Sequence, residues 1–109
     1  MLVTAAAGGV GLATVEVAKQ MGASRVIAAC GSDEKLSTAT SKGAEALGVN
    51  YSDADAKEFR ARLKAAAGER GIDVAVDMVG GDLLEACVRS LNWNGRAAVV
   101  GFASGTRPL

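Results

Sequence analysis

A cluster of alanine and glycine between an apolar run and a helical pattern is the part of this chain best suited to chemistry. The apolar residues Leu2 to Thr4 are followed by AAAGGVG, residues 5–11, and apolar side chains recur at helical spacing from Val10 onward. A tight strand-to-helix turn lets a phosphate approach the backbone, and the unpaired amides at the helix N-terminus favour an anion. The spacing Ala-x-Gly-x-x-Gly resembles a dinucleotide-binding G-x-G-x-x-G with Ala6 at the first glycine. The cluster predicts a dinucleotide pyrophosphate site, and tight packing of a helix on its strand is the alternative.

The two glycines at positions 8 and 11 have different roles in this hypothesis. A Cβ atom at Gly8 would hold a pyrophosphate away from the backbone, and one at Gly11 would push the helix away from its strand. The amides of Gly9 and Val10 begin the helix and would face the phosphates. The cluster therefore predicts both close packing and close approach of an anion.

The residues after the second predicted strand indicate which dinucleotide would fit. The apolar run RVIAAC, residues 25–30, is followed by Gly31 and Ser32, with no carboxylate at the tip of the strand. A site specific for NAD normally has an acidic residue there, which binds the adenosine ribose. Gly31 and Ser32 instead leave room for a 2′-phosphate, and Lys35 can neutralise it, with an ordinary surface lysine as the alternative. The pattern favours NADP over NAD.

Strands and helices alternate along the whole chain, without a linker or an internal repeat. We expect strands at residues 2–4, 25–30, 46–51, 72–79 and 96–102, and helices at residues 10–21, 33–42, 53–68 and 82–91. The residues NWNG, 92–95, are expected to form a turn before the last strand. This alternation predicts an α/β fold with a doubly wound parallel sheet of the Rossmann type, with helices on both faces. The expected strand order is 3-2-1-4-5, which places ligands beyond the carboxyl ends of the strands, beside the first strand.

Short polar side chains mark the starts of the later helices. Asp33 and Glu34 fall in the first turn of the second helix, where acids suit the helix dipole, and we expect both to point to solvent. Glu85 and Arg89 form an outward pair four residues apart on the fourth helix. The expected N-caps of the second, third and fourth helices are Ser32, Ser52 and Asp82.

Composition excludes several classes of function. The chain has 12 basic and 12 acidic residues, so no basic surface favours nucleic acid, and it has no histidine for a Ser-His-Asp site. No apolar stretch is long enough to span a membrane. Cys30 and Cys87 are not at a metal-binding or redox spacing, which predicts buried, reduced thiols and a cytoplasmic location. We expect no catalytic residue and no metal ligand within the chain.

Two further patterns with acidic residues do not indicate a catalytic site. Asp73 and Asp77 lie on the same face of one predicted strand, but Asp77 is expected at its carboxyl end, bound to loop amides, and Asp73 at its solvated start. Tyr51 has Asp55, not a lysine, four residues on. That spacing excludes the Tyr-x-x-x-Lys pair of the short-chain dehydrogenases.

Five motifs in register resemble one family over nearly the whole chain. The chain is similar to the medium-chain dehydrogenase/reductases, and most of all to their zinc-independent quinone oxidoreductase, or zeta-crystallin-like, branch. The resemblance implies NADPH-dependent reduction of quinones or activated double bonds, usually by a homodimer. The motifs are AAAGGVG, CGSDEK, GVNYSD, IDVAVDMVGG and GRAAVVGFASG.

The resemblance also implies a role for individual residues at the cofactor. The pyrophosphate would contact Ala7, Gly8, Gly9 and Val10. The 2′-phosphate would be held by Gly31, Ser32 and Lys35. Tyr51 would contact the adenosine phosphate side of the cofactor. Val79 would lie by the adenine-side ribose. The residues near the nicotinamide would be Gly101, Phe102 and Ala103. Two of these assignments have open alternatives, because Tyr51 could direct its hydroxyl into water and Phe102 could be a core residue.

Members of the family also have a substrate-binding domain, whose segments flank the cofactor-binding one. Residues 1–109 are therefore expected to form the dinucleotide-binding domain, which would bind NADPH without turnover. The small-molecule substrate would bind only in the full-length parent. A sensor or scaffold that binds the dinucleotide without catalysis is the alternative. A methyltransferase-like nucleotide binder is disfavoured, because the second strand lacks an acidic tip.

The fifth predicted strand is apolar and nearly uncharged. If it forms the edge of the sheet, the run RAAVVGF, residues 96–102, would pair with another copy of the chain. The expected partners are the dinucleotide and a second copy of this chain in a homodimer, with no nucleic acid and no membrane.

Overall fold

The computed structural model describes residues 1–44, 48–52 and 55–101, and within them strands and helices alternate. The strands are β1 (Leu2–Thr4), β2 (Ile27–Cys30), β3 (Val49–Asn50), β4 (Ile72–Asp77) and β5 (Leu91–Val99). The helices are α1 (Gly9–Gln20), α2 (Asp33–Ser41), α3 (Ala56–Ala67) and α4 (Gly81–Ser90), with a short 3-10 turn, η1 (Gly68–Arg70), after α3.

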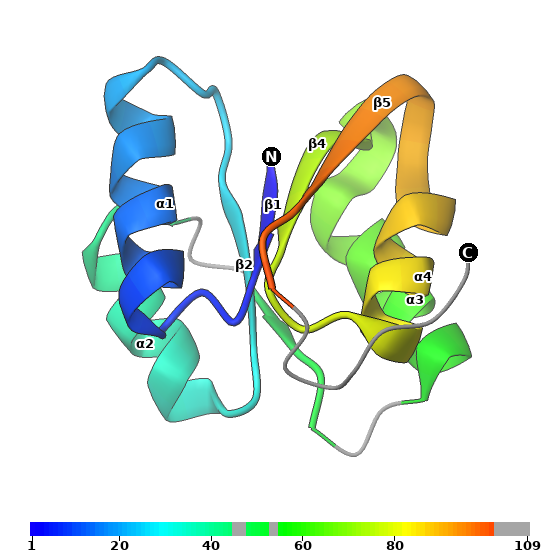
Figure 1. Cartoon of the computed structure of the whole chain (residues 1–109), viewed down its shortest axis with the longest axis horizontal. Coiled ribbons are helices and arrows are strands. Elements are labelled where there is room, and N and C mark those ends of the chain that lie inside the picture. Colours follow the sequence, from blue (N-terminus) through cyan, green and yellow to red (C-terminus); the bar gives the residue numbers. More distant parts are fainter. Residues whose placement is uncertain (45–47, 53–54, 102–109) are drawn as a thin grey trace.

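The five strands form one parallel sheet in the order β3-β2-β1-β4-β5 (Figure 1). The strand order reverses at β1, which pairs with β2 on one side and with β4 on the other. This confirms the predicted fold and strand order. The carboxyl ends of β1, β2 and β4 consequently lie at the same edge of the sheet, where a doubly wound fold binds its ligands.

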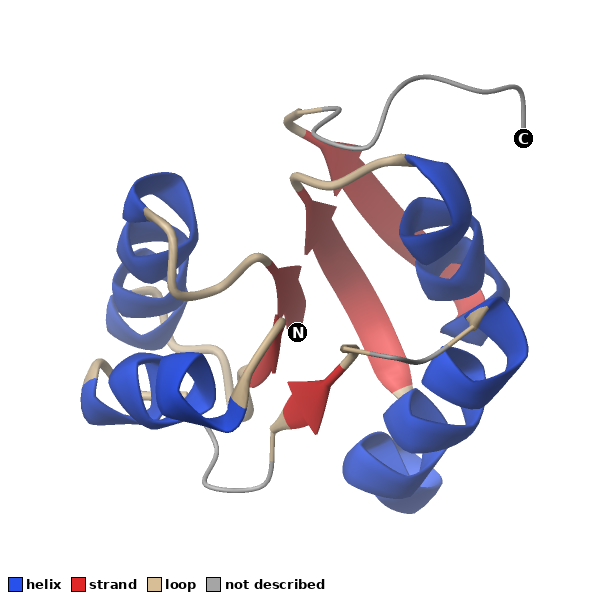
Figure 2. Cartoon of the chain, turned by 90° about the horizontal axis from the view of Figure 1, so that it is seen from below, coloured by secondary structure: helices blue, strands red, loops and turns tan. Residues whose placement is uncertain are grey.

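Helices cover both faces of the sheet, α1 and α2 on one face and α3 and α4 on the other (Figure 2). The strand side chains alternate between these two layers, as the pleat requires. In β2, Ile27 and Ala29 face the α3 and α4 layer, whereas Ala28 and Cys30 face the α1 and α2 layer. In β1, Leu2 packs in the core between the sheet and the α3 and α4 layer. Strands β1 and β2 are therefore apolar at every position but one, the buried Thr4.

The fifth strand begins earlier than the sequence predicts. β5 starts at Leu91 and includes residues 92–95, which we expected to form a turn. The β4–β5 register shifts between Ile72 and Val74, and Asn94 has a positive φ of 65°. The Asn92 side chain donates to the carbonyl of Arg70 at 2.8 Å, so a bulge held by an amide replaces the predicted turn.

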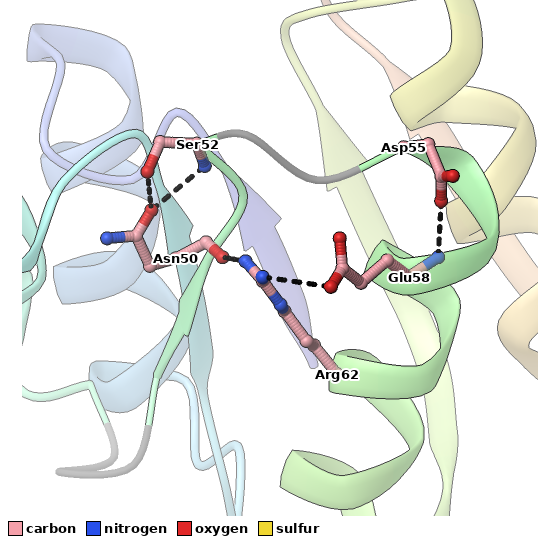
Figure 3. Close-up of polar contacts among 5 residues, drawn as sticks. All are labelled: Asn50, Ser52, Asp55, Glu58 and Arg62. Atoms are coloured by element: carbon pink, nitrogen blue, oxygen red, sulfur yellow. Dashed lines mark hydrogen bonds and ion pairs between the residues drawn. The ribbon is translucent and has the colours of Figure 1, made fainter.

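Two of the three predicted N-caps are wrong. Ser32 caps α2 as predicted, because its Oγ accepts the amide of Lys35 at 3.2 Å. The cap of α3 is Asp55 and not Ser52, and its Oδ1 accepts the amide of Glu58 at 2.8 Å (Figure 3). The chain between β3 and α3 continues past Ser52, so the helix starts later than the pattern indicates.

The fourth helix has no side-chain cap. Its N-cap is Gly80, with φ 76° and ψ −163°, and Asp82 lies inside the first turn. Gly81 also has a positive φ, of 57°. Two glycines therefore make the sharp turn from β4 into α4, and the helix begins before Asp82, which is why Asp82 is not the cap. The predicted outward pair on this helix is confirmed, with Arg89 Nη2 3.0 Å from Glu85 Oε1.

Candidate functional site

The turn between β1 and α1 is tight because Gly11 brings the helix against the end of the strand. The amide of Gly8 donates to the carbonyl of Ala5 at 3.0 Å, and Ala5 has a positive φ of 48°. A Cβ atom added at Gly11 would lie 2.2 Å from the Ala5 carbonyl oxygen and 2.8 Å from the Cα atom of Ala6. Only glycine permits this approach, which confirms the predicted packing role of Gly11.

The N-terminus of α1 has no acidic residue and no side-chain cap. Its N-cap is Gly8, and the first turn holds neither Asp nor Glu. The N-termini of α2 and α3, in contrast, are capped by Ser32 and Asp55. A Cβ atom added at Gly9 would meet nothing within 4 Å, so the space beside the first turn is open. The positive end of the α1 dipole is therefore available to an external anion at the carboxyl edge of the sheet.

A cleft of about 410 Å³ lies between the β1–α1 turn and the start of α2. It collects six of the predicted site residues, which are Ala7, Gly8, Gly31, Ser32, Lys35 and Tyr51. These residues follow three different strands, β1, β2 and β3, whose carboxyl ends meet at this edge of the sheet. The fold thus brings two of the four predicted pyrophosphate residues and all three predicted 2′-phosphate residues together around one hollow.

The wall of the cleft formed by the start of α2 is polar and positively charged at Lys35. Ser32 Oγ accepts the Lys35 amide, so its hydroxyl hydrogen remains free to donate to a ligand. Gly31 keeps the cleft wide, because a Cβ atom there would lie 3.8 Å from the Tyr51 ring. Because Lys35 and Ser32 border the same hollow, both can reach one anion.

Four residues of the cleft were not predicted as site residues: Ala5, Cys30, Glu34 and Thr38. Glu34 borders the cleft but is exposed, and Asp33 is exposed as well, so both first-turn acids face solvent as expected. Asp33 Oδ1 accepts from Asn50 Nδ2 at 3.1 Å. Helical periodicity could have found Thr38, which lies one turn after Glu34 and donates to its carbonyl at 3.3 Å.

Tyr51 closes the far side of the cleft. Its ring packs edge-on against Phe59, with ring centroids 5.8 Å apart, and its amide donates to the carbonyl of Cys30 at 3.0 Å. Burial raises the pKa of the Tyr51 hydroxyl, the nearby Cys30 raises it further, and a hydrogen bond with the Ala5 backbone partly offsets both. The half-buried hydroxyl therefore lies beside the backbone of Ala5, where the glycine turn begins.

Asn50 fixes the end of β3 that carries Tyr51 (Figure 3). Its backbone carbonyl accepts from the Arg62 guanidinium of α3, and its Oδ1 accepts from the amide of Ser52 at 2.9 Å and from its hydroxyl at 2.7 Å. The Asn50 side-chain amide donates to Asp33, in the first turn of α2. Tyr51 is thus held in the cleft by contacts with α2 and α3.

The remaining predicted residues lie outside this cleft. Gly9 and Val10 form the first turn of α1. Val79 follows β4 and Gly101 follows β5, and both lie across β1 from the cleft. Phe102 and Ala103 lie outside the residues that the structure describes.

The end of β4 is tied to the end of β1. The Thr4 hydroxyl donates to Asp77 Oδ1 at 2.8 Å, and Asp77 Oδ2 accepts the Gly80 amide at 2.7 Å. This confirms the prediction that Asp77 binds a loop amide. Asp73 is exposed near the start of β4, as predicted, where its Oδ1 accepts from Asn92 Nδ2 at 3.0 Å.

Comparison with known proteins identifies the family. Residues 9–109 match the sequence profile of a family described as zinc-binding dehydrogenase. The chain belongs to this family.

Within the zinc-binding dehydrogenases, the chain is similar to quinone oxidoreductases. It is 50% identical over 105 residues to rat quinone oxidoreductase-like protein 2, an alignment that covers 96% of this chain and 29% of the relative. The structure of Escherichia coli quinone oxidoreductase complexed with NADPH matches 98% of the chain and 31% of its own, with a TM-score of 0.83 and 34% identity. A mycobacterial protein complexed with NADPH matches 99% of the chain and 32% of its own, with a TM-score of 0.83 and 35% identity. These similarities confirm the predicted resemblance.

The chain spans about 29% of the length of the curated quinone oxidoreductase-like relatives that it matches. Despite the family's name, residues 1–44, 48–52 and 55–101 contain no group of three or more His, Cys, Asp or Glu side chains placed to hold a metal ion. Cys30 and Cys87 are buried free thiols, as predicted. Within the described part of the chain, no helix has the length and apolar character needed to cross a membrane.

Proposed function

We propose that this chain binds NADPH as the cofactor-binding domain of a quinone oxidoreductase-like enzyme. The observation that carries the proposal is the cleft beside the uncapped N-terminus of α1, where Ser32 and Lys35 replace the acid of an NAD site. Solved relatives with the same fold are complexed with NADPH, which supports the assignment. The similarity to reductases favours an enzyme domain over the non-catalytic sensor or scaffold.

The proposed binding mode follows the sheet from β3 to β5. The pyrophosphate would contact the amides of the first turn of α1 and the glycine turn before it, contributed by Ala7, Gly8, Gly9 and Val10. Lys35 and the Ser32 hydroxyl would bind the 2′-phosphate across Gly31, and Tyr51 would contact the adenosine phosphate side. Val79 would lie by the adenine-side ribose, and Gly101, with Phe102 and Ala103, near the nicotinamide.

The bound cofactor would supply a hydride to a quinone or an activated alkene. This chain's own residues would bind the cofactor, orient it across the carboxyl ends of the strands and neutralise its phosphates. Transfer also requires the substrate to be held against the nicotinamide. Because the chain spans less than a third of its relatives, we propose that the remaining part of the enzyme supplies that contact. The chain alone would bind NADPH with negligible turnover.

Titration of the chain with NADPH and NADH, followed by cofactor fluorescence, tests the proposal. We expect NADPH to bind at least about tenfold more tightly, since a charge-assisted contact to the 2′-phosphate contributes on the order of 1.5 kcal/mol or more. Lys35→Met should remove most of this preference, and Glu34→Gln, which removes a negative charge from the cleft, should increase it.

Lys57→Met is the matched control, because Lys57 is an exposed lysine of α3 that does not line the cleft. It should bind both cofactors as the wild type does. Equal affinity of the wild type for NADPH and NADH would contradict the 2′-phosphate assignment. Failure to bind either cofactor would contradict the proposed function itself.

We also propose that two copies of the chain associate through β5 and that the enzyme is cytoplasmic. Within the described part of the chain β5 borders only β4, so one side of its backbone is unpaired. Trp93 and Val99 are exposed on this strand, and Val100 is exposed directly after it. An exposed apolar edge of this length favours pairing with a second edge, which supports the homodimer.

A further inference from the structure

A buried pair of polar side chains joins the two central strands beside the glycine turn. Thr4, the last residue of β1, and Asp77, the last residue of β4, are both 0% exposed, and they are the only buried polar or charged side chains in the described part of the chain. The Thr4 hydroxyl donates to Asp77 Oδ1 at 2.8 Å across 73 positions of sequence. The pair therefore lies where the strand order reverses.

The pair organises the backbone of the β4–α4 turn. Thr4 Oγ1 accepts the amide of Met78 at 3.1 Å, and Asp77 Oδ2 accepts the amide of Gly80 at 2.7 Å. The carbonyl of Asp77 accepts the amide of Val100 at 2.8 Å, which continues the contacts to the chain after β5. The two side chains thus bind two amides of the β4–α4 turn, and the Asp77 backbone carbonyl links this turn to the chain after β5.

The β4–α4 turn that the pair holds contains two glycines, whose backbone can adopt many conformations. Gly80 and Gly81 both have positive φ values, and glycine loses the most conformational freedom when it is ordered. A buried carboxylate is costly to desolvate, and an apolar pair of similar volume would stabilise the sheet at least as well. The contribution specific to Thr4 and Asp77 is directional, because only hydrogen bonds can select one position for the amides of this turn.

We propose that Thr4 and Asp77 are a positioning pair for the cofactor. By binding Met78 and Gly80, they hold the β4–α4 turn, with Val79 at its centre, at a fixed place beside the glycine turn that starts at Ala5. A turn ordered in advance does not have to be ordered when the ligand binds, and this increases affinity. The inference rests on the proposed NADPH site, and neither side chain needs to touch the cofactor.

Two variants of Thr4 separate the effect of its hydroxyl group from the effect of its branched side-chain shape. Thr4→Val keeps the branched shape and removes the donor to Asp77, whereas Thr4→Ser keeps the donor and removes a methyl group. Because one or two hydrogen bonds are lost, we expect Thr4→Val to bind NADPH about tenfold or more weakly and Thr4→Ser to stay within about threefold of the wild type. Asp77→Asn, which turns an amide group toward the Gly80 N–H or the Thr4 hydroxyl, should behave like Thr4→Val.

Amide hydrogen exchange of the unliganded chain gives a readout that does not depend on the cofactor. In Thr4→Val the amides of Met78 and Gly80 should exchange about tenfold or more faster relative to the Ile27 amide of β2, which reports opening of the central sheet. Leu63→Val is the control, because it weakens the core on α3 without a contact to this turn. It should lower the unfolding midpoint while NADPH affinity and the relative exchange of Met78 and Gly80 stay unchanged.

Each outcome decides one of the two proposals. Equal NADPH affinity of folded Thr4→Val and wild type would overturn the positioning role, as would equal losses in Thr4→Val and Thr4→Ser. If Thr4→Val does not fold, unchanged affinity and exchange in Asp77→Asn would overturn it. If the wild type does not bind NADPH, the proposed function fails, and the exchange of Met78 and Gly80 still decides whether the pair holds the turn.

Discussion

At the scale of single residues, the two glycines at the start of α1 differ sharply in what they permit. A Cβ atom at Gly11 would overlap the Ala5 carbonyl at 2.2 Å, whereas one at Gly9 would meet nothing. We expect Gly11→Ala to lower the free energy of unfolding by about 1–3 kcal/mol, as overpacking does, and to displace α1 from β1. Gly9→Ala should leave the free energy of unfolding unchanged or raise it by up to about 1 kcal/mol.

Urea denaturation of both variants measures the difference. Equal stability of Gly11→Ala and Gly9→Ala would show that the turn relaxes without cost and would contradict a packing role for Gly11. Because Gly9→Ala places a methyl group in the open space beside the first turn, its NADPH affinity separately reports how closely a ligand approaches the backbone.

Residue identity predicted the packing at Gly11 but not the strain at Ala5. The sequence motif places its first glycine position at Ala6, yet the positive φ of 48° falls on Ala5. Left-handed backbone at alanine carries no signal in residue type, because alanine avoids that region. The place of Glu34 beside the cleft was likewise not predicted, since it depends on how α2 is oriented against the cleft, which periodicity alone does not give.

At the scale of elements, the sequence predicted the type of each helix and strand better than its ends. Ser52 and Asp55 are both suitable N-cap residues, and the expected cap of α3 is Ser52. A local contact decides against Ser52, because Asn50 Oδ1, two residues earlier, accepts from both its amide and its hydroxyl. The start of β5 was missed because of tertiary contacts, since Asn92 replaces the expected turn with contacts to η1 and β4.

The exposed edge of β5 leads to a prediction at the same scale. Light scattering should show a dimer or larger species for the isolated chain at high concentration, because β5 presents an unpaired backbone and exposed valines. Val99→Lys should shift the population toward monomer, since a charge on an edge strand opposes pairing. A monodisperse monomer of the wild-type chain at high concentration would contradict association through this edge.

At the scale of the whole molecule, the strand order could be predicted because few topologies satisfy the physical rules. Each of the first four strands is followed by a helix, so the strands are parallel with right-handed crossovers, and the glycine cluster after β1 marks the point where the order reverses. The joining of β1 to β4 through Thr4 and Asp77 could be predicted only in part. Asp77 is apparent as a strand-end acid, but a threonine in a run of apolar residues gives no indication of its partner 73 positions away.

Stability at high pH is a property of the whole molecule that depends on its buried thiols. Burial, with a smaller contribution from the charge of Asp77, raises the pKa of the Cys87 thiol from 9.0 to about 12. The unfolded chain therefore releases this proton near pH 9, whereas the folded chain keeps it until about pH 12. Below pH 9 the stabilisation is fully present, and it is lost as pH rises through this interval, by at most about 1.4 kcal/mol per pH unit for one thiol.

Urea denaturation at pH 8 and about pH 10.5 should therefore show a smaller decrease in the free energy of unfolding for Cys87→Ala than for the wild type, with a difference on the order of 1–2 kcal/mol. The comparison uses the slope with pH, so the cavity that alanine leaves in the core affects both pH values equally. Burial also raises the pKa of Cys30, which keeps its own contribution in both proteins. Parallel slopes for the two proteins would show that Cys87 ionises alike in the folded and unfolded states, and that water reaches this part of the core between β4 and α4.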